Sequence, residues 1–303
     1  MTITCFSDLT ANAIAAREKT VLAVVEAHDP GTIGSVVKAA EEGIIRPVLI
    51  GRAAGIGKLI VESGLNPSDY ETVDSADSLE SLNIAVEMIR SGKAAALMKG
   101  MLDTAEFMKA VVSKDNGLLT GSRLSLGALY EIPKYHKLLA VSDVVVNLYP
   151  DLECKRAIIE NAVGMLRTLG IAHPKVAVLA AVEKINPKMP ETVDADALKK
   201  MNIAGVISGC VIEGPISFDL ATIAEAASIK GYDSPVAGDA DLLVVHDIAS
   251  GNILAKCLTG MAGAMTAGTI LGAKIPIVLT SRSAETSDKY YSIALAACLG
   301  RGE

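Results

Sequence analysis

Aromatic residues are scarce in this sequence: none of its 303 residues is tryptophan, and only 3% are phenylalanine or tyrosine. A core with few rings must be built from alanine, valine, isoleucine, leucine and methionine. This composition favours an α/β fold over an all-β sandwich or barrel. Half of the residues are nevertheless hydrophobic, so the chain can bury a large core, and its length suggests two domains.

An excess of positive charge is also missing, since the formal net charge is −7. A nucleic acid or an anionic membrane is therefore not the expected partner. The five cysteines show no metal-ligand or redox-motif spacing, which favours a reducing cytoplasm, and residues 1–8 do not resemble a signal peptide. The most apolar long window, 257–273, just reaches the lower limit for a membrane span, and its glycines suit a packed helix better.

Nucleotide and metal motifs are absent in their usual form. The segment Gly51–Leu59 contains glycines and a lysine after a predicted strand, but Arg52 stands where a phosphate loop needs glycine, and Leu59 replaces its hydroxyl. The four histidines are far apart in the sequence, so a zinc site is not expected. The acids of Asp239–Asp241 and Asp247 could coordinate magnesium, although acids at strand ends more often cap helices.

Apolar runs of strand length alternate with helical patterns through most of the chain. The predicted strands include 21–25, 47–50, 94–98, 175–179, 205–207 and 241–245, and the predicted helices include 32–42, 78–91, 103–112 and 151–169. This alternation predicts mostly parallel, doubly wound sheets. We expect a first domain of residues 1–140 plus 270–303 and a second domain of residues 141–269. Because no long linker separates them, the two should pack around a shared cleft.

The segment Lys274–Asp288 carries the strongest functional signal. A short apolar run is followed by Ser281, Arg282 and Asp288, and then by a helical pattern. This order is typical of a buried strand that delivers polar groups at its carboxyl end, where open α/β sheets bind ligands and helix N-termini attract anions. A hydroxyl, a guanidinium and a carboxylate there suit transfer chemistry on an anionic group, although an ordinary capped helix would have a similar sequence.

Three other strand-end segments share this character: Lys99–Thr104, Gly214–Asp219 and Asp247–Asn252. Each combines small, polar and glycine residues at the predicted start of a helix, and each alone could be an ordinary turn. If they face one crevice, they form a long groove for an extended anionic ligand.

At these segments, and also at Met98–Gly100 and Ala237–Asp241, the chain resembles the phosphate acyltransferases, the family of phosphate acetyltransferase and phosphate butyryltransferase. The likeness extends over nearly the whole length, with His246 standing where many relatives have proline. It implies reversible transfer of a short acyl group, acetyl or butyryl, between coenzyme A and inorganic phosphate, by direct thiol attack in a ternary complex. It also implies a homodimer without metal or separate cofactor. The implied fold has two domains, is related to isocitrate and isopropylmalate dehydrogenases, and holds the active site between the domains.

The resemblance also assigns roles to individual residues. Ser281 and Arg282 match the Ser–Arg pair of the family, and Asp288 matches its acid, with Glu285 as a competing carboxylate one turn earlier. Arg123 matches a phosphate-binding arginine. The other substrate-binding candidates are Lys99, Gly100, Thr104, Gly214, Ser217, Asp247, Gly251 and Asn252.

Elementary acid–base chemistry agrees with these roles. A thiol with a pKa of about 8.5 is mostly protonated at neutral pH, so a carboxylate such as Asp288 can help to form the thiolate. Two other functions stay open from the sequence. One is a metal- and NAD-dependent decarboxylating dehydrogenase of related fold, and the other is a non-catalytic protein that binds coenzyme A.

Overall fold

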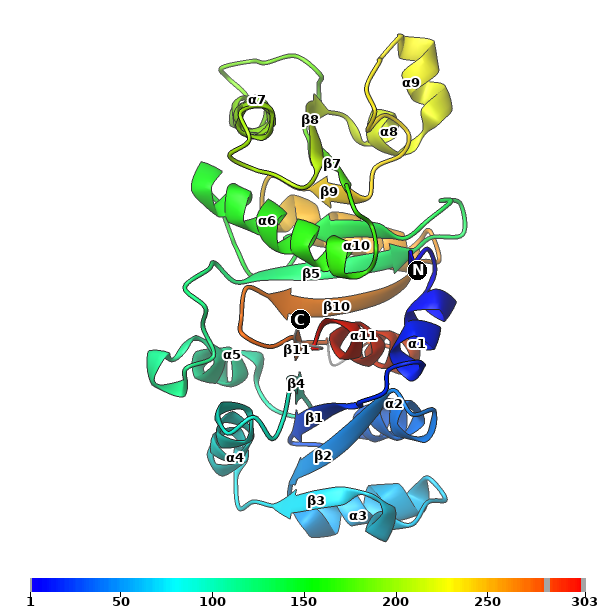
Figure 1. Cartoon of the computed structure of the whole chain (residues 1–303), viewed down its shortest axis with the longest axis vertical. Helices are drawn as coiled ribbons and strands as arrows, with labels where there is room; N and C mark the ends of the chain where they lie inside the picture. Colours follow the sequence, from blue (N-terminus) through cyan, green and yellow to red (C-terminus); the bar gives the residue numbers. More distant parts are fainter. Residues whose placement is uncertain (1, 281–283, 301–303) are drawn as a thin grey trace. The chain divides into compact units, whose positions relative to one another are not determined.

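The structure, a computed structural model, describes residues 2–280 and 284–300, and the chain divides into two compact units (Figure 1). Unit 1 consists of Met1–Phe6 and Arg123–Thr266, and unit 2 consists of Ser7–Ser122 and Ala267–Glu303. Each unit combines a sheet that is mostly parallel with several helices. The predicted α/β fold class is confirmed.

The sheet of unit 2 is built on the apolar runs predicted from the sequence. Its parallel strands lie in the order β3–β2–β1–β4–β11. They are β1 (Thr20–Val25), β2 (Ile45–Gly51), β3 (Glu71–Asp74), β4 (Ala96–Lys99) and β11 (Ile277–Val278), and β10 (Met265–Leu271) pairs antiparallel with β11. The strands β1, β2 and β4 are almost wholly buried, because apolar and β-branched residues fill them on both faces.

Several helices of unit 2 begin where the sequence provides a cap. Asp29 caps α2 by accepting the N–H of Thr32, and Asp77 and Asp103 cap α4 and α5 in a similar way. The helices are α1 (Phe6–Ile14), α2 (Pro30–Glu41), α3 (Ala53–Glu62), α4 (Ser78–Arg90), α5 (Thr104–Val112) and α11 (Thr286–Leu299). The strand order reverses between β1 and β4, so their carboxyl ends form the switch point at which open α/β sheets bind ligands.

Unit 1 has a mixed sheet. The strands β5 (Ser125–Glu131) and β6 (Leu139–Ser142) form an antiparallel pair, and β9 (Leu242–Val244), β7 (Lys175–Leu179) and β8 (Val211–Ile216) continue the sheet in parallel. The helices are α6 (Leu152–Thr168), α7 (Pro190–Ile203), α8 (Phe218–Thr222), α9 (Ala224–Lys230) and α10 (Ile248–Gly260). Asp151 caps α6, at the predicted start of that helix.

The chain passes between the units at positions that differ in part from the expected ones. It enters unit 1 at Arg123, before β5, because the antiparallel pairing of β5 with β6 holds β5 in that unit. It returns at Ala267, close to the expected residue 270. The segment Met1–Phe6 also joins unit 1, where the N–H of Ile3 donates to the carbonyl oxygen of Leu169.

Two local expectations are corrected by the structure. The window 257–273 forms the end of α10 and the whole of β10, and not one packed helix. The strand expected at 205–207 is a turn after α7, in which Gly205 has a φ of +77°, and the strand itself follows as β8. Over residues 2–280 and 284–300, no helix has both the length and the apolar character needed to cross a membrane.

Candidate functional site

The predicted catalytic segment is described only in part. Ser281 and Arg282 lie outside the described residues, whereas Asp288 lies in the first turn of α11 and is partly exposed. Glu285, the competing carboxylate, is the N-cap residue of the same helix and is exposed to solvent. A carboxylate in this position is favoured by the free N–H groups at the helix N-terminus. Of the two carboxylates, Asp288 is the more enclosed.

A buried ion pair fixes the turn that carries Asp288. Lys289 is 6% exposed, and its Nζ lies 3.0 Å from Oδ1 of Asp29. The same oxygen accepts the N–H of Thr32 at the start of α2. Burial alone would raise the pKa of Asp29, but the hydrogen bonds from Thr32 and Lys289 outweigh it and lower that pKa. The first turn of α11 is thereby tied to the N-terminus of α2.

Lys99 and Gly100 shape the loop after β4. Lys99 is buried, and its Nζ donates to the carbonyl oxygens of Gly100 and Leu102 at 3.1 and 3.0 Å. A Cβ atom on Gly100 would lie 2.2 Å from the carbonyl oxygen of Glu26, so only glycine fits. Thr104, the first residue of α5, is exposed. Lys99 and Gly100 therefore hold the end of β4 against β1, and Thr104 is left open to a ligand.

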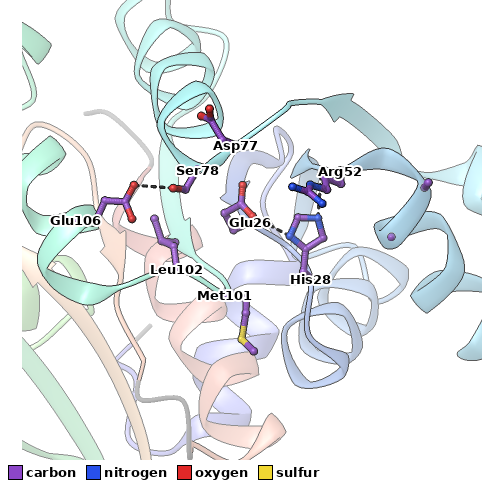
Figure 2. A pocket seen from close by; sticks show the side chains of 10 residues that line it. Glu26, His28, Arg52, Asp77, Ser78, Met101, Leu102 and Glu106 are labelled. Carbon is purple, nitrogen blue, oxygen red and sulfur yellow. Dashed lines mark hydrogen bonds and ion pairs between the residues drawn. The ribbon is translucent and has the colours of Figure 1, made fainter.

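A pocket of about 640 Å³ opens at the switch point of unit 2 (Figure 2). In Figure 2, Glu106 lies at one end of the pocket and Arg52 at the other, with Glu26 between them. The residues that line it come from the ends of β1, β2 and β4 and the starts of α3, α4 and α5: Glu26, His28, Arg52, Ala54, Gly55, Asp77, Ser78, Met101, Leu102 and Glu106. Met101 and Leu102 belong to the predicted segment Lys99–Thr104, and the other lining residues were not predicted as site residues.

Hydrogen bonds fix the floor of the unit 2 pocket. Nδ1 of His28 lies 2.9 Å from Oε2 of Glu26, and Nε2 of His28 accepts the backbone N–H of Arg52 at 2.9 Å (Figure 2). Glu26 also accepts the hydroxyl of Ser81, and its φ of +55° is one that side-chain-bearing residues rarely adopt. Because both ring nitrogens are engaged, His28 ties β1 to β2 and is not placed to act as a base.

The charges of this pocket limit what it can bind. The carboxylates of Glu26, Asp77 and Glu106 outnumber the guanidinium of Arg52, so the pocket is negative overall. A negative pocket repels a free phosphate ion. The unit 2 pocket is therefore a poor candidate for the phosphate subsite, and its carboxylates suit hydroxyl or amine donors better.

Three further candidates, Arg123, Gly214 and Ser217, lie in unit 1 outside the start of α10. Arg123 stands two residues before β5 and is exposed. Gly214 lies in β8, where a Cβ atom would come within 3.0 Å of a side chain of β7 and 3.1 Å of one of α7. Ser217, at the start of α8, donates its hydroxyl to Glu183 at 2.6 Å. Gly214 therefore serves close packing, and Arg123 is the residue here that reaches solvent with a charge.

The segment Asp247–Asn252 forms the start of α10. Asp247 makes a capping box with Ser250, whose N–H it accepts at 2.8 Å, and the bonds from Ser250 lower the pKa of Asp247. A Cβ atom on Gly251 would lie 2.8 Å from the carbonyl oxygen of Asp143, so glycine lets the helix approach the loop after β6. Nδ2 of Asn252 donates to the carbonyl oxygen of the next residue in that loop, at 3.4 Å.

A second pocket, of about 420 Å³, brings two of the predicted segments together within unit 1. Gly214–Asp219 contributes Phe218, and Asp247–Asn252 contributes Asp247 and Ser250. The residues that line this unit 1 pocket are Leu179, Ala180, Ala181, Glu191, Phe218, Val245, His246, Asp247, Ser250 and Leu254. It lies at the carboxyl ends of β7 and β9, where a parallel sheet is expected to bind its ligand.

Asp239 and Asp241, considered above as magnesium ligands, are engaged by cations of the protein. Nζ of Lys137 lies 2.7 Å from Asp239 and 2.6 Å from Asp241, and Lys175 and His136 also pair with Asp239. Burial alone would raise the pKa of Asp239, but the bonds from these partners lower it. In the part of the chain that the structure describes, no group of three or more His, Cys, Asp or Glu residues is arranged to hold a metal ion.

Asp239→Asn should destabilise unit 1 near neutral pH and have little effect at low pH. The pKa of Asp239 is lower in the folded protein than in the unfolded chain, so its ion pairs stabilise the fold above the ordinary aspartate pKa of about 3.9 and are lost as the pH falls below it. We expect a loss of about 1–2 kcal/mol at pH 7 in urea unfolding, since the carboxylate is 38% exposed. A difference from the unaltered protein that stays constant down to about pH 2 would contradict this linkage.

Comparisons with known proteins agree with the resemblance seen in the sequence. The family profile described as phosphate acetyl/butaryl transferase matches residues 78–297. A phosphate acetyltransferase of Rhizobium meliloti is 42% identical over 285 residues, which cover 93% of this chain and 90% of that protein. A phosphate butyryltransferase of Clostridium acetobutylicum is 39% identical over 284 residues, which cover 94% of both. The crystal structure of a branched-chain phosphotransacylase from Enterococcus faecalis V583 matches with a TM-score of 0.83 at 31% identity, covering 94% of this chain and 100% of that one.

Proposed function

The chain belongs to the phosphate acetyl/butyryl transferase family and is an acyltransferase, and we propose that it transfers a short acyl group between coenzyme A and inorganic phosphate by direct attack of the thiol. The observation that carries this proposal is the likeness to both kinds of relative over more than nine-tenths of the chain. It favours acyl transfer over the two alternatives raised by the sequence, the decarboxylating dehydrogenase and the non-catalytic binding protein.

The proposed reaction needs one proton transfer and one displacement. In the direction that forms acyl-CoA, the carboxylate of Asp288 takes the thiol proton, and the sulfur attacks the acyl carbon. The bond from that carbon to the bridging oxygen of the acyl phosphate then breaks, and inorganic phosphate leaves. An aspartate is a weak base for a thiol, so its contribution depends on its placement beside the reacting groups. The ion pair of Lys289 with Asp29 fixes the first turn of α11, which supports this role for Asp288.

Other side chains would stabilise charge on the substrates. We propose that the hydroxyl of Ser281 donates to the oxyanion that develops on the acyl carbonyl, and that the guanidinium of Arg282 binds the phosphate through forked hydrogen bonds. The exposed Arg123 is proposed as a further phosphate ligand. Thr104 is the exposed candidate after β4, where Lys99 and Gly100 position the loop.

We propose that coenzyme A is held by the unit 1 pocket. The pocket combines apolar walls with polar groups at the start of α10, and the carboxylates of Glu191 and Asp247 in its lining suit the uncharged parts of coenzyme A better than its phosphates. Gly251 allows the close approach that brings this helix start beside the pocket, and Asn252, Gly214 and Ser217 belong to the same strand-end segments.

The setting of the reaction is also proposed from the resemblance. We expect a homodimer that acts in the cytoplasm and uses coenzyme A as a substrate, with no separate cofactor. The cysteines show no redox-motif spacing in the sequence, which supports a reducing compartment. The two units would correspond to the two domains of the isocitrate dehydrogenase-like fold implied by the sequence.

Release of thiol from acyl-CoA in the presence of phosphate or arsenate tests the proposed function. We expect release from acetyl-CoA or butyryl-CoA that depends on the anion and is unaffected by NAD or magnesium. Across a C2 to C6 series, each methylene should change kcat/KM by about 10- to 200-fold where the acyl pocket reads chain length. The absence of anion-dependent release from every acyl-CoA in the series would overturn the proposal.

A further inference from the structure

An asparagine of α6 holds the backbone of Arg123, the candidate phosphate ligand of unit 1. Nδ2 of Asn161 donates to the carbonyl oxygen of Arg123 at 2.8 Å and to the hydroxyl oxygen of Ser125 at 3.0 Å. Ser125 is the first residue of β5 and is completely buried, whereas Arg123 is exposed. One amide group therefore ties the exposed arginine both to α6 and to the buried start of a strand.

A second asparagine, Asn147, holds the next residue of the chain. Its Nδ2 donates to the carbonyl oxygen of Leu124 at 2.8 Å and to Oδ2 of Asp143 at 2.6 Å, and its Oδ1 accepts the thiol of Cys154 at 3.4 Å. Asp143 is 3% exposed and also accepts the backbone N–H of Leu126 at 3.2 Å. Because a carbonyl and a carboxylate can only accept, these partners fix the direction in which the amide of Asn147 points.

The two asparagines act at the edge of the sheet where a ligand is expected. The pairing of β5 with β6 runs from Ala128 to Tyr130 on β5, so residues 123–126 precede it and are held by side chains of α6 and of the loop after β6. The strand β5 runs antiparallel to β6, whereas β6, β9 and β7 are parallel. The start of β5 therefore lies at the carboxyl ends of the parallel strands of unit 1.

The charge of Arg123 lies near the residues that hold its backbone. Burial raises the pKa of the Cys154 thiol, and among the charges that act on this thiol the guanidinium of Arg123 has the largest effect and lowers that pKa. The same thiol donates to Asn147. Among residues 2–280 and 284–300, Arg123 forms no ion pair with a carboxylate, so its guanidinium is open to an anion.

We propose that Asn161 and Asn147 are positioning residues for the phosphate site, because their amide groups hold the backbone that presents the guanidinium of Arg123. This inference rests on the proposed function, since it takes Arg123 as a phosphate ligand. A guanidinium binds phosphate oxygens through a fork of two hydrogen bonds, which needs a set direction as well as a set distance. Arginine has a long and flexible side chain, so a fixed backbone limits the number of positions that the fork can take.

The test measures the affinity of the full chain for inorganic phosphate. The dissociation constant is obtained from a titration followed by ³¹P nuclear magnetic resonance, and the KM for phosphate from the release of thiol. Arg123→Ala should weaken phosphate binding by about tenfold or more, because charge-assisted hydrogen bonds are lost. Asn161→Leu removes the amide at nearly constant size. It should weaken phosphate binding by about threefold to tenfold and change the KM for acyl-CoA by less than about twofold.

Combining the two substitutions distinguishes positioning from a general structural role. If Asn161 acts through Arg123, Asn161→Leu should change phosphate affinity by less than about twofold in a chain that already carries Arg123→Ala. A loss by the same factor in both chains would overturn the positioning role. Asn147→Leu should give the same pattern, although it also takes a partner from the buried Asp143. If Asn147→Leu does not fold, Asn161→Leu decides the question alone.

The chain offers a matched control in Asn202, on α7. Its Nδ2 donates to the carbonyl oxygens of Ile207 and Cys210 at 2.9 and 3.1 Å, and the residue is partly exposed, as Asn161 is. Asn202→Leu should lower the thermal midpoint about as much as Asn161→Leu does and leave phosphate affinity within about twofold. Equal weakening of phosphate by Asn202→Leu would show that loosening of unit 1 in general sets the affinity, and it would overturn the inference.

The outcomes separate this inference from the proposed function. If the unaltered chain releases no thiol but binds phosphate, and Asn161→Leu weakens that binding only while Arg123 is present, the proposed function fails and the positioning role stands. If the unaltered chain releases thiol and Asn161→Leu changes neither the dissociation constant nor the KM for phosphate, the positioning role fails and the proposed function stands. Phosphate binding that Arg123→Ala leaves unchanged would overturn the inference at its premise.

Discussion

Asp288→Asn should lower the turnover number by about 10²- to 10⁴-fold and change the dissociation constant of coenzyme A by less than about twofold. The substitution keeps the size of the side chain and its place in the first turn of α11, but an amide cannot accept the thiol proton. Because the carboxylate is assigned to proton transfer and not to binding, the loss should appear in kcat. Steady-state kinetics in both directions, with calorimetric titration of coenzyme A, measure the two quantities.

The chain offers a matched control for this prediction in Glu285→Gln. Glu285 is the exposed N-cap residue of the same helix and makes no side-chain capping bond, so its loss should leave kcat within about twofold and stability nearly unchanged. If Glu285→Gln lost turnover and Asp288→Asn kept it, the base would be Glu285. If both substitutions had equal and small effects on kcat, neither carboxylate would be the base that takes the thiol proton.

The placement of Asp288 depends on contacts that no local sequence pattern reveals. Lys289 and Asp29 are 260 residues apart, yet their ion pair joins α11 to α2. The sequence predicted a helix after the final strand, because that signal is local. It did not predict that the residue after Asp288 is a buried cation whose partner is the cap of another helix.

The accuracy of the fold prediction follows the strength of the local signals. The strands β1, β2, β4 and β7 were predicted because each is a short run of apolar residues between helical patterns. The strand β3 was not, because Glu71–Asp74 pairs with β2 alone at the described edge of its sheet and is partly exposed. An edge strand needs no apolar run, so periodicity does not detect it.

The strand β8 was displaced in the prediction because its sequence departs from that of a buried strand. It contains Glu213, a glycine and a proline, whereas Val206 and Ile207 upstream look more strand-like. The structure buries Glu213 to 8% exposure by pairing it with Lys199 at 2.6 Å and Ser234 at 2.9 Å. Burial alone would raise the pKa of Glu213, but these bonds lower it. Partners from other parts of the unit therefore allow a glutamate to lie in a buried strand, which the local sequence pattern did not predict.

The candidate site likewise combines residues that the local sequence pattern identified and residues that it did not. In unit 1, Phe218 and Asp247 belong to strand-end segments that the sequence identified, and they line one pocket. In unit 2, the pocket floor joins Glu26 to Ser81, 55 residues away, and His28 to Arg52, 24 residues away. Such pairs leave no spacing signal in a single sequence. The one hint available was that Glu26 and Arg52 each stand just after a predicted strand.

Gly100→Ala should destabilise unit 2 by about 2–4 kcal/mol, the largest effect on stability that we expect from a single methyl group here. The added Cβ atom would lie 2.2 Å from the carbonyl oxygen of Glu26 and 2.7 Å from that of Val25. Both atoms belong to the backbone and cannot rotate away. The same carbonyl of Val25 also accepts the N–H of Gly100 at 2.8 Å, so a shift that relieves the clash would break this bond between β1 and β4. Calorimetry should show a thermal midpoint lower by roughly 5–15 °C.

Gly164→Ala is the control for this prediction. Gly164 lies inside α6 with nothing within 4 Å of an added Cβ atom, so alanine should stabilise that helix by about 0.5–1 kcal/mol through its higher helix propensity. A loss of stability in Gly100→Ala and a gain in Gly164→Ala would show that the space around the added methyl group decides the effect, and not the removal of a glycine in itself. The experiment also separates two roles for Gly100, because a residue needed only for ligand contact would raise KM with no change in the thermal midpoint. That result would contradict the packing role and return Gly100 to the substrate-binding residues.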